Sequence, residues 1–574
     1  MKTITSQLLG IFQHRVSTRN VRMLRLYLLV FVGMVGAYTG IFHWLMAEEN
    51  QKHSWFTGLY WTLSTMSTLG YGDVSFTSDA GRAFSVLVLM SGMVFLLVML
   101  PFTFIEFFYA PWMQAQEESR APRRLKGEVS GHVIITNYTP VTAALIVRLR
   151  QYGVPYVLIV REVPEALKFH DEGINVIVGE PDFPDVYERA RIDTAAMVTA
   201  TSTDTMNTNI AFTVRQLATT IPIVTTASDV NSMDVLQFAG ASHVIRLSNL
   251  MGQWLARRTI GGDAEAHVIG TFDELQIAEA TAAGTPLVGK RIGQTNLREM
   301  VGVSVVGVWD RGQFTAATSR TEINSTTVLV LAGSQDQLSA YDAMFCIYHR
   351  ATAPVIIIGG GRVGRATGRA LEQREVDFKI VERRPERIRD EMEEKYVLGN
   401  ASDIEVLESA GIREAPAVII TSHEDDVNIY LTIYCRKLRP DIEIISRCTQ
   451  ERNVNTMHRA GADFVMSNAS MGANIMFNLL RSGDLLMLAE GLDLFRVDIP
   501  ARLVGKPIKA TSIREETGCT IVALSIDGKM IANPEPDHVL EADTTMVLIG
   551  TAEAESEFLN KYPGKNNASV TTSS

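Results

Sequence analysis

Hydrophobic residues are concentrated near the start of the chain, where two long apolar runs stand between polar segments. Leu26–Ala47 carries no charged side chain apart from the titratable His43, and Ala83–Ile105 carries none. A helix needs about 20 predominantly apolar residues to cross a bilayer, and buried helices of soluble domains are typically shorter. The pattern therefore predicts two membrane-spanning helices. A buried helix pair in a soluble domain is the alternative.

The segment between the two runs combines a helical pattern with a glycine-rich turn. "SWFTGLYWTLSTM", from Ser54 to Met66, has aromatic and apolar residues at helical spacing, and "TLGYGD" follows it. Non-helical backbone at membrane depth is tolerated only where protein or a water-filled cavity surrounds it. Gly70 and Gly72 permit backbone angles that turn successive carbonyls toward one axis. We therefore expect a short re-entrant helix followed by a carbonyl-lined loop, with the hydroxyl of Thr68 at its inner end.

This loop resembles the signature of potassium channels, in which four copies replace the hydration shell of K⁺ with oxygen atoms. An isolated Gly-Tyr-Gly would indicate only a turn, but here it lies between a predicted re-entrant helix and a predicted span. The resemblance implies a selectivity filter made of Thr68, Leu69, Gly70, Tyr71, Gly72 and Asp73.

Basic residues predict how the spans are oriented. They cluster before the first run and after the second, whereas the loop between the runs is acidic: Lys2, Arg15, Arg19, Arg22 and Arg25; Arg120, Arg123, Arg124 and Lys126; Glu48, Glu49, Asp73 and Asp79. Cytoplasmic flanks of spans are enriched in Lys and Arg. We expect a multi-pass protein of the cell (inner) membrane, embedded in the lipid bilayer, with its N-terminus and its C-terminal part in the cytoplasm.

The second run contains two residues that disturb helices. Gly92 lowers helix stability by about 1 kcal/mol relative to alanine, and Pro101 cannot donate a hydrogen bond to the carbonyl of Leu97. Our hypothesis is that this region bends during gating and that Leu96, Leu97 or Leu100 closes the inner pore. A bend that serves only packing is the alternative. Voltage sensing is not expected, because no membrane helix is rich in arginine.

Three separated blocks after the spans occur twice, which indicates a duplicated module of about 220 residues. The pairs are "GHVIITNYTP" at 131 and "APVIIIGGGR" at 353, "GASHVI" at 240 and "GADFVM" at 461, and "LVGKRIG" at 287 and "LVGKPIK" at 503. In each copy, apolar strand-like runs alternate with helical stretches, and a smaller strand-rich lobe follows. That alternation predicts a doubly wound α/β fold with a parallel sheet.

The predicted organisation is a membrane α-helical pore module followed by two Rossmann-like modules, each with a small α+β lobe. Its segments are an N-terminal segment 1–22, a pore domain 23–110, a linker 111–130, a first Rossmann-like lobe 131–264 with its C-terminal lobe 265–350, a second Rossmann-like lobe 351–484 with its C-terminal lobe 485–562, and a disordered tail 563–574.

The second copy contains a complete dinucleotide fingerprint. Gly359, Gly361 and Gly364 stand in G-x-G-x-x-G order between a strand and a helix, and Glu382 ends the next strand. Such glycines let backbone amides and a helix N-terminus approach a diphosphate, and the acidic residue accepts hydrogen bonds from the adenosine ribose. Glu382 favours NAD over NADP, although Arg383 and Arg384 weaken that preference. A Rossmann-like sheet without a ligand is the alternative.

The first copy has lost this fingerprint. Asn137, Thr139 and Thr142 replace the glycines, and Val160, or Arg161 if the strands are shifted by one residue, replaces Glu382. We expect this copy to be structural or to respond to another ligand.

Taken together, residues 22 to about 560 resemble prokaryotic potassium channels with tandem RCK (regulator of potassium conductance) domains. The resemblance implies a homotetramer with a cytoplasmic gating ring that pulls on the inner helices when a nucleotide, NAD(H) or ADP/ATP, binds to the second module. It places Arg362 and Val363 with the three glycines near the phosphates, Glu382 and Arg383 at the ribose, and Asn400 and Ala401 near the adenosine. Some relatives bind Ca²⁺, for which Glu180, Asp182 and Asp185 are candidates, with a solvated acidic turn as the alternative reading.

Composition and charge exclude other classes. A net charge of −11 argues against a nucleic-acid partner. The four cysteines are widely separated, which fits a reducing compartment and no structural zinc. A membrane-tethered NAD-dependent oxidoreductase, with His423 as its acid or base, is the alternative function, but it leaves the filter unexplained. A subunit of a potassium-uptake transporter would usually carry pore and RCK parts on separate chains. We therefore expect a channel and not an enzyme.

Overall fold

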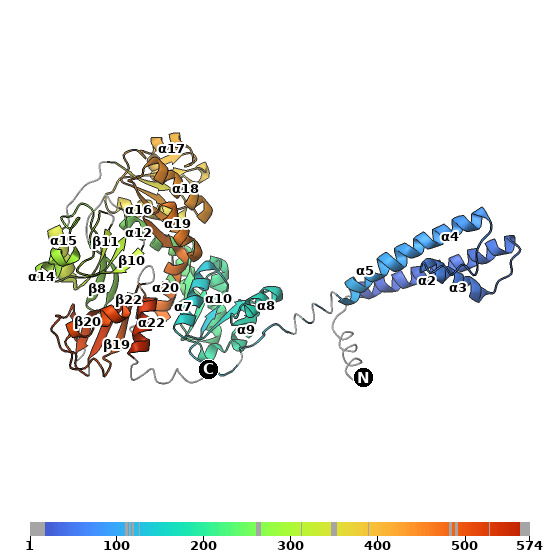
Figure 1. Ribbon diagram of the computed structural model, residues 1–574, viewed down its shortest axis with the longest axis horizontal. Coiled ribbons are helices and arrows are strands. Elements are labelled where there is room, and N and C mark those ends of the chain that lie inside the picture. The colour runs from blue at the N-terminus through green and yellow to red at the C-terminus, as the bar shows by residue number, and fades with distance from the viewer. Residues whose placement is uncertain are drawn as a thin grey trace. The chain divides into compact units, whose positions relative to one another are not determined.

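The computed structural model describes residues 18–109, 113, 116, 120–125, 127–259, 266–310, 313–325, 327–345, 353–388, 390–480, 485–487, 492–526, 529–542 and 544–562. The predicted tail and most of the predicted N-terminal segment lie outside these residues. The chain forms two compact units (Figure 1). One consists of the described residues up to Pro122 together with Glu162–Asp171, and the other of Arg123–Arg161 and the described residues from Glu172 onward.

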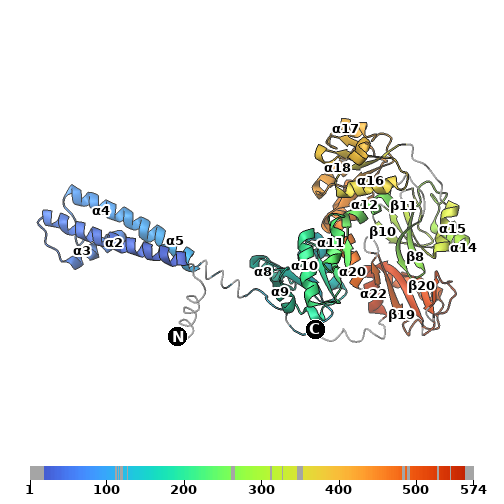
Figure 2. The same ribbon diagram turned by 180° about the vertical axis from the view of Figure 1, so that it is seen from behind.

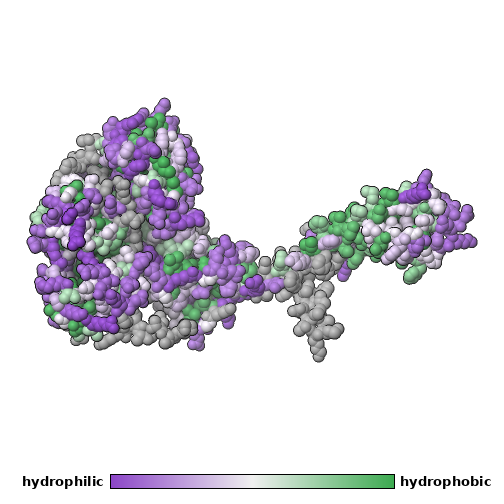
Figure 3. All heavy atoms as spheres, in the orientation of Figure 1, coloured by the Kyte–Doolittle hydropathy of each residue, from purple (hydrophilic) through white to green (hydrophobic). Residues whose placement is uncertain are grey.

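The first unit holds two helices long and apolar enough to cross a membrane, over Arg25–Glu48 and Asp79–Thr103. Hydrophobic side chains cover the middle of these helices in Figure 3, and hydrophilic ones cover the end where they are joined. The elements are α2 (Thr18–Glu48), α3 (Trp55–Met66), α4 (Asp79–Gly92), the π-helix η1 (Met93–Met99), α5 (Leu100–Phe104) and the π-helix η2 (Ile105–Tyr109). Two spans with a short helix between them were predicted, and this arrangement is confirmed.

Aromatic rings hold α3 between the two spans. The Trp61 ring of α3 lies 5.0 Å from that of Phe42 in α2 and 5.8 Å from that of Phe84 in α4, measured between ring centroids. Phe42 is fully buried. A second link joins the end of α2 to the start of α4, because the Glu49 carboxylate accepts hydrogen bonds from the backbone amides of Thr77 and Ser78 at 2.9 and 3.0 Å. Hydrogen bonds from Ser78 and Thr77 lower the pKa of Glu49 to about 2.

The first copy of the repeat is a doubly wound α/β lobe. Its strands pair in parallel in the order β3-β2-β1-β4-β5-β6. The strands are β1 (Val133–Ile135), β2 (Tyr156–Val160), β3 (Val176–Val178), β4 (Met197–Ala200), β5 (Ile223–Thr226) and β6 (His243–Ile245); the helices are α7 (Pro140–Gln151), α8 (Val163–Asp171), α9 (Pro184–Arg189), the 3₁₀-helix η3 (Ile192–Thr194), α10 (Asp204–Leu217), α11 (Ser232–Phe238) and α12 (Leu247–Arg257).

The second copy repeats this topology in the order β14-β13-β12-β15-β16-β17, again with parallel pairing, so the predicted fold class is confirmed. The strands are β12 (Val355–Ile358), β13 (Phe378–Glu382), β14 (Tyr396–Leu398), β15 (Ala417–Ile420), β16 (Glu443–Cys448) and β17 (Phe464–Ser467); the helices are α16 (Arg362–Glu372), α17 (Ile404–Ser409), α18 (Asp425–Leu438), α19 (Val454–Ala460) and α20 (Asn468–Leu480), with 3₁₀-helices η4 (Pro385–Arg387), η5 (Asp390–Lys395) and η6 (Glu451–Asn453).

Each copy ends in an antiparallel lobe, with strand orders β10-β9-β11-β8-β7 and β18-β19-β22-β20-β21. The first lobe contains β7 (His267–Phe272), β8 (Leu275–Thr281), α13 (Ile292–Thr295), α14 (Leu297–Val301), β9 (Ser304–Asp310), β10 (Gln313–Ala316), β11 (Thr327–Gly333) and α15 (Gln335–Phe345); the second contains β18 (Leu485–Met487), β19 (Leu492–Asp498), the 3₁₀-helix η8 (Ile508–Ala510), α21 (Ile513–Thr517), β20 (Thr520–Ile526), β21 (Lys529–Ala532), β22 (Thr545–Thr551) and α22 (Ala552–Lys561).

Each copy packs one of its helices against the other copy. The last helix of the first Rossmann-like lobe, α12, packs against α16 of the second, and α20 of the second packs against α7 of the first (Figures 1 and 2). Both contacts depend on glycine. A Cβ atom at Gly252 would lie 2.5 Å from the Cβ of Ala366, and one at Gly472 would lie 2.7 Å from the Cγ1 of Val141. The helix that follows the glycine fingerprint is thus in direct contact with the first copy.

A buried hydrogen-bond cluster also joins the copies. The hydroxyl of Tyr152, at the end of α7, lies 2.9 Å from Oδ2 of Asp493 in β19 and 2.6 Å from Oε2 of Glu555 in α22. Asp493 is fully buried, and this burial raises the pKa of its carboxyl group. Since a phenol has one proton, it donates to one carboxyl group at a time.

We expect Tyr152→Phe to destabilise the cytoplasmic part by about 1.5–3 kcal/mol, the usual loss for a hydrogen bond to a charged group. The raised pKa of Asp493 means that the folded state binds more protons than the unfolded state, so its contribution to stability falls as pH rises above about 4, the unfolded pKa of Asp. Thermal unfolding of the purified protein at several pH values measures both effects. An unchanged unfolding midpoint in the variant would contradict the assignment.

Candidate functional site

The TLGYGD loop follows α3 directly, and its glycines adopt backbone angles that favour glycine. Gly70 has φ +46° and Gly72 has φ +76°, and Thr68 also has a positive φ of 63°. The amides of Leu69 and Gly70 donate to the carbonyl of Ser64, which fixes the loop to the end of the pore helix. The side chains of Leu69 and Tyr71 are exposed in the single chain. The positive φ angles therefore account for the two glycines of this loop, and its role as a selectivity filter stays a prediction.

Gly92 lies where the second span meets the pore helix. A Cβ atom here would lie 2.3 Å from the Cα and 2.4 Å from the carbonyl oxygen of Met66, so only glycine permits this approach. Close packing therefore accounts for glycine at this position, and the bending of this region during gating stays a prediction.

The helix changes its hydrogen-bonding pattern just before Pro101. The π-helix η1 covers Met93–Met99, and Pro101 occupies the first turn of α5. In a π-helix each carbonyl accepts from the amide five residues onward. The carbonyl of Leu97, four residues before Pro101, therefore does not depend on the amide hydrogen that proline lacks. The predicted interruption near Pro101 is therefore observed as a change of helix type. Leu97 and Leu100 are exposed in the single chain, whereas Leu96 packs against the core of the two spans. The latter packing makes Leu96 the weakest of the three gate candidates.

The G-x-G-x-x-G segment of the second copy has the geometry of a phosphate-binding turn. Gly359 follows β12 with φ +107°, and Gly361 is the N-cap of α16. A Cβ atom at Gly364 would lie 1.9 Å from the carbonyl oxygen of Gly359, so the helix can approach the strand only at a glycine. A Cβ at Gly361, in contrast, would have nothing within 4 Å. The N-terminus of α16 therefore faces open space in which an anion can bind.

Glu382 ends β13 beside this turn and is almost fully buried. Its Oε2 accepts a hydrogen bond from the amide of Gly360 at 2.8 Å, and its Oε1 accepts one from the amide of Arg384 at 2.9 Å. Each carboxylate oxygen has two lone pairs, so acceptor capacity remains for the hydroxyl groups of a ribose.

The other predicted nucleotide ligands follow β12 and its neighbours at the same edge of the sheet. Arg362 and Val363 begin α16, and Arg362 is exposed. Arg383 directly follows β13, while Asn400 and Ala401 follow β14, the neighbour of β13. Because these are carboxyl ends of adjacent parallel strands, the residues lie along one edge of the sheet, where doubly wound folds bind their ligands.

Sequence reasoning missed Thr421, which supports the turn. Its hydroxyl lies 3.0 Å from the carbonyl oxygen of Ile358 and 2.9 Å from that of Gly359. The signal was its position at the carboxyl end of β15, next to β12 at the point where the strand order reverses.

The first copy fills the corresponding place with its own side chains. Thr139 caps α7, since its hydroxyl accepts from the amide of Thr142, and the Thr142 hydroxyl donates to the carbonyl of Asn137 at 2.9 Å. The register of the strands also settles the position opposite Glu382. Val133 pairs with Tyr156 as Val355 pairs with Phe378, so Val160 corresponds to Glu382 without a shift. This helix N-terminus is therefore closed to a nucleotide in the same pose.

Two of the three acidic residues considered for calcium pair with arginines. Glu180 pairs with Arg161 at 3.1 Å, and Asp185 pairs with Arg189 at 2.9 Å. Asp182 lies near Tyr187 and raises the pKa of its hydroxyl, after the larger effect of burial. No group of three or more His, Cys, Asp or Glu side chains in the described part of the chain is arranged to hold a metal ion. Arginines thus engage the charges of Glu180 and Asp185, and calcium binding by these three residues stays a prediction.

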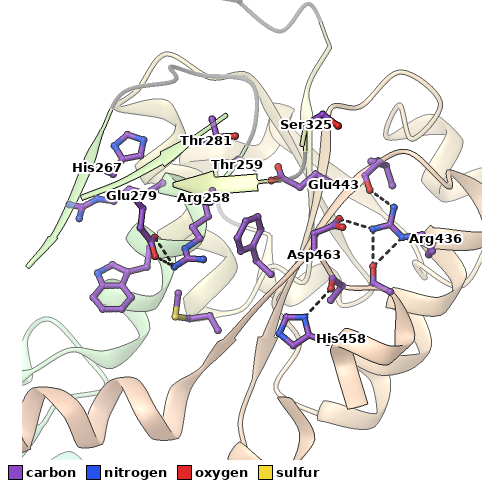
Figure 4. Close-up of a pocket in the computed structure, with 18 of the residues that line it drawn as sticks. Arg258, Thr259, His267, Glu279, Thr281, Ser325, Arg436, Glu443, His458 and Asp463 are labelled. Atoms are coloured by element: carbon purple, nitrogen blue, oxygen red, sulfur yellow. Dashed lines mark hydrogen bonds and ion pairs between the residues drawn. The ribbon is translucent and has the colours of Figure 1, made fainter. Parts of the chain in front are cut away.

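A separate cavity of about 760 Å³ lies between the first copy's C-terminal lobe and the second Rossmann-like lobe (Figure 4). Two ion pairs lie in its wall: Arg258 with Glu279 at 2.7 Å, and Arg436 with Asp463 at 2.6 Å. Burial, followed by nearby arginines, lowers the pKa of His267 to about 4. The fingerprint residues do not line this cavity.

Each main part of the chain matches a known protein family. The Ion channel model matches residues 29–109, the TrkA-N domain model matches 133–247 and 355–468, and the TrkA-C domain model matches 277–345 and 494–562. The solved structure of the GsuK channel bound to NAD is 35% identical, with a TM-score of 0.58, and the alignment covers 95% of this chain and 99% of that one.

Two curated relatives from Methanocaldococcus jannaschii are similar over shorter stretches. Potassium channel protein 1 is 27% identical over 220 residues, which are 36% of this chain and 66% of the relative. Probable potassium channel protein 2 is 28% identical over 217 residues, which are 34% of this chain and 63% of the relative. The chain thus spans about two thirds of the length of these curated relatives. They are channels, in agreement with the expectation that this protein is not an enzyme. Its two spans, its duplicated TrkA-type modules and its likeness to GsuK along almost the whole chain together show that the protein belongs to the family of potassium channels with RCK domains.

Proposed function

We propose that this protein is a potassium-selective channel whose opening is biased by an adenine nucleotide at the second RCK module. The observation that carries the proposal is the presence, in one chain, of the TLGYGD loop with left-handed glycines and of an open, glycine-lined helix N-terminus beside Glu382. The permeant ion is K⁺, because rings of carbonyl oxygens replace its hydration shell.

NAD(H) and ADP/ATP share the features that this crevice would recognise. Both carry an adenosine ribose, whose hydroxyls suit Glu382, and a diphosphate, which suits the amides at the start of α16. The negative charge of Glu382 disfavours a 2′-phosphate. The related GsuK channel has been solved with NAD bound.

The functional unit would be a homotetramer embedded in the bilayer, since one chain supplies one loop of a filter that needs four. Exposed apolar residues on the helices of both RCK modules support association between chains. Phe212 on α10 and Phe238 on α11 are exposed in the first module, and Tyr430 and Ile433 on α18 are exposed in the second. Such residues on neighbouring helices indicate surfaces that a partner covers.

Nucleotide binding would act on the pore by linkage, because a ligand shifts an equilibrium only by its difference in affinity for the two states. A tenfold preference is worth about 1.4 kcal/mol per site. Four sites would supply about 5.6 kcal/mol, close to the ~5.5 kcal/mol that turns a 1:99 population into 99:1. The contact of α16 with α12 gives the bound helix a direct path to the first module. Leu97 and Leu100 are the preferred gate residues, with the π-helical segment before Pro101 as the part that changes shape.

Potassium flux through the purified, reconstituted channel tests the proposal, with and without NAD or ADP on the cytoplasmic side. The native mass is measured first and should equal four chains. We expect nucleotide to change the flux, and Glu382→Ala to weaken the nucleotide response by about 10- to 100-fold in concentration, since hydrogen bonds to a charged group are lost.

The control variant is Glu414→Ala, an exposed carboxylate before β15 at the opposite edge of the same sheet. It should respond as the wild type does. Flux that ignores both nucleotides would refute nucleotide gating and leave the pore assignment standing. Hydride transfer from NADH to an acceptor would instead support the oxidoreductase alternative.

A further inference from the structure

Arg447, at the end of β16, is a partly buried cation near the proposed nucleotide site. Its Nε atom is buried and has no hydrogen-bond partner among the described residues. No carboxylate of the described part of the chain lies within ion-pair distance of it. The nearby Asp425 is occupied elsewhere, because its carboxylate accepts hydrogen bonds from the amides of Thr449 and Gln450 and from the side chain of Asn453. A partly buried guanidinium whose charge Asp425 offsets only in part is suited to bind an anion from outside the chain.

The surroundings of Arg447 show which way its side chain points. Its Nη2 atom lies 3.3 Å from Nδ1 of His423, which follows β15. Burial lowers its pKa first; the negative charge of Asp425 raises the pKa in part, and the positive charge of Arg362 at the start of α16 lowers it. The guanidinium therefore reaches from β16 across the end of β15 toward the N-terminus of α16. That crevice lies at the point where the strand order reverses.

The first copy serves as an internal comparison. The side-chain amide of Asn207 donates to the carbonyl of Thr226 at 2.8 Å, and that of Asn428 donates to the carbonyl of Arg447 at 2.9 Å. Thr226 and Arg447 are therefore equivalent positions. The copy whose helix N-terminus is closed by Thr139 has threonine there, and the copy with the open, glycine-lined turn has arginine. The arginine is thus found in the copy that has the glycine turn, and the first copy folds the same lobe with threonine at this position.

We propose that Arg447 binds the phosphate farther from the adenosine, the β-phosphate of ADP or the nicotinamide-side phosphate of NAD. The order of the strands supports this direction. Glu382 on β13 would hold the ribose, and the glycines after β12 would hold the first phosphate. Arg447 on β16 would then bind the second phosphate, which extends past β15. A guanidinium is suited to this task, because its fixed donors match phosphate oxygens in pairs. The inference rests on the proposed function, since it concerns the same nucleotide site.

Binding of ADP, NAD and AMP to the full-length purified channel tests this role, measured by titration calorimetry for the wild type, Arg447→Thr and Arg447→Lys. AMP lacks the second phosphate. In Arg447→Thr, which introduces the residue of the first copy, ADP and NAD should bind about 10- to 100-fold more weakly, while AMP changes less than about twofold. Arg447→Lys should recover part of the ADP affinity, because it keeps the charge and loses the paired donors.

The control variant is Arg413→Thr, which removes the same charge from an exposed ion pair with Glu408 before β15. It should bind all three nucleotides as the wild type does. Equal weakening of AMP and ADP in Arg447→Thr would assign Arg447 a structural role and overturn the proposal. Unchanged ADP binding would overturn it as well, while leaving nucleotide binding intact. A wild type that binds none of the three nucleotides would refute the proposed function, and the assignment of Arg447 with it.

Discussion

Replacing Gly72 by alanine should abolish potassium conduction, with flux reduced at least ~100-fold, because an ordered ring of carbonyls is required for the ion to shed its water. Gly72 has φ +76°, a left-handed conformation that costs an L-residue with a Cβ atom about 1–2 kcal/mol. Four chains would carry this strain around one axis. The alanine therefore favours a flipped peptide, which points an amide and not a carbonyl toward the ion.

Flux of K⁺ from vesicles measures the effect, with the tetramer mass verified before reconstitution. Gly36→Ala is the matched control, because Gly36 lies in α2, and an added Cβ there would have nothing within 4 Å. This control should assemble and conduct normally. If Gly72→Ala conducts as well as the control, the loop is not the ion-selective element, and the pore must lie elsewhere.

Replacing Gly364 by alanine should eliminate the nucleotide response while leaving the filter intact. The added Cβ would lie 1.9 Å from the carbonyl oxygen of Gly359 and 2.9 Å from the hydroxyl of Thr421. Neither the strand end nor the first turn of α16 can yield without moving the other, so overpacking here should cost at least the usual ~1–3 kcal/mol. The helix would shift away from β12 and carry its N-terminal amides out of position for a diphosphate.

Gly361→Ala separates steric damage to the fold from obstruction of the ligand. An added Cβ at Gly361 would have nothing within 4 Å, and the residue already has an ordinary φ of −69°. This variant should unfold at the wild-type temperature and yet bind ADP more weakly, because its methyl group occupies the space facing the phosphates. Calorimetric ADP titrations and thermal unfolding of both variants measure the difference. Full ADP affinity in Gly364→Ala would show that the turn does not hold the nucleotide.

The functional predictions from the sequence depended on local chemistry, which sequence patterns report well. The two spans follow from hydropathy alone, and the fingerprint follows from three glycines and an acid at fixed spacing. Gly92 shows where such reasoning stops. A glycine within a membrane helix is compatible with a flexible point or with a contact point, and only the structure shows that Gly92 contacts Met66 of another element. The acidic residues Glu180 and Asp185 were similarly ambiguous until their arginine partners were located.

By itself the sequence predicted two helices long and apolar enough to cross a membrane, and it showed a potassium-channel signature and a duplicated Rossmann-like module with one intact nucleotide fingerprint. These properties depend on residue type and on spacing within a few turns or strands. Only the tertiary structure decided that Val160 corresponds to Glu382, that Thr139 caps the first copy's helix, that α12 and α16 pack together, and that Arg447 contacts His423. The physical reason is the same in each case: these contacts join segments far apart in the chain, and their partners are set by the packing of the whole domain.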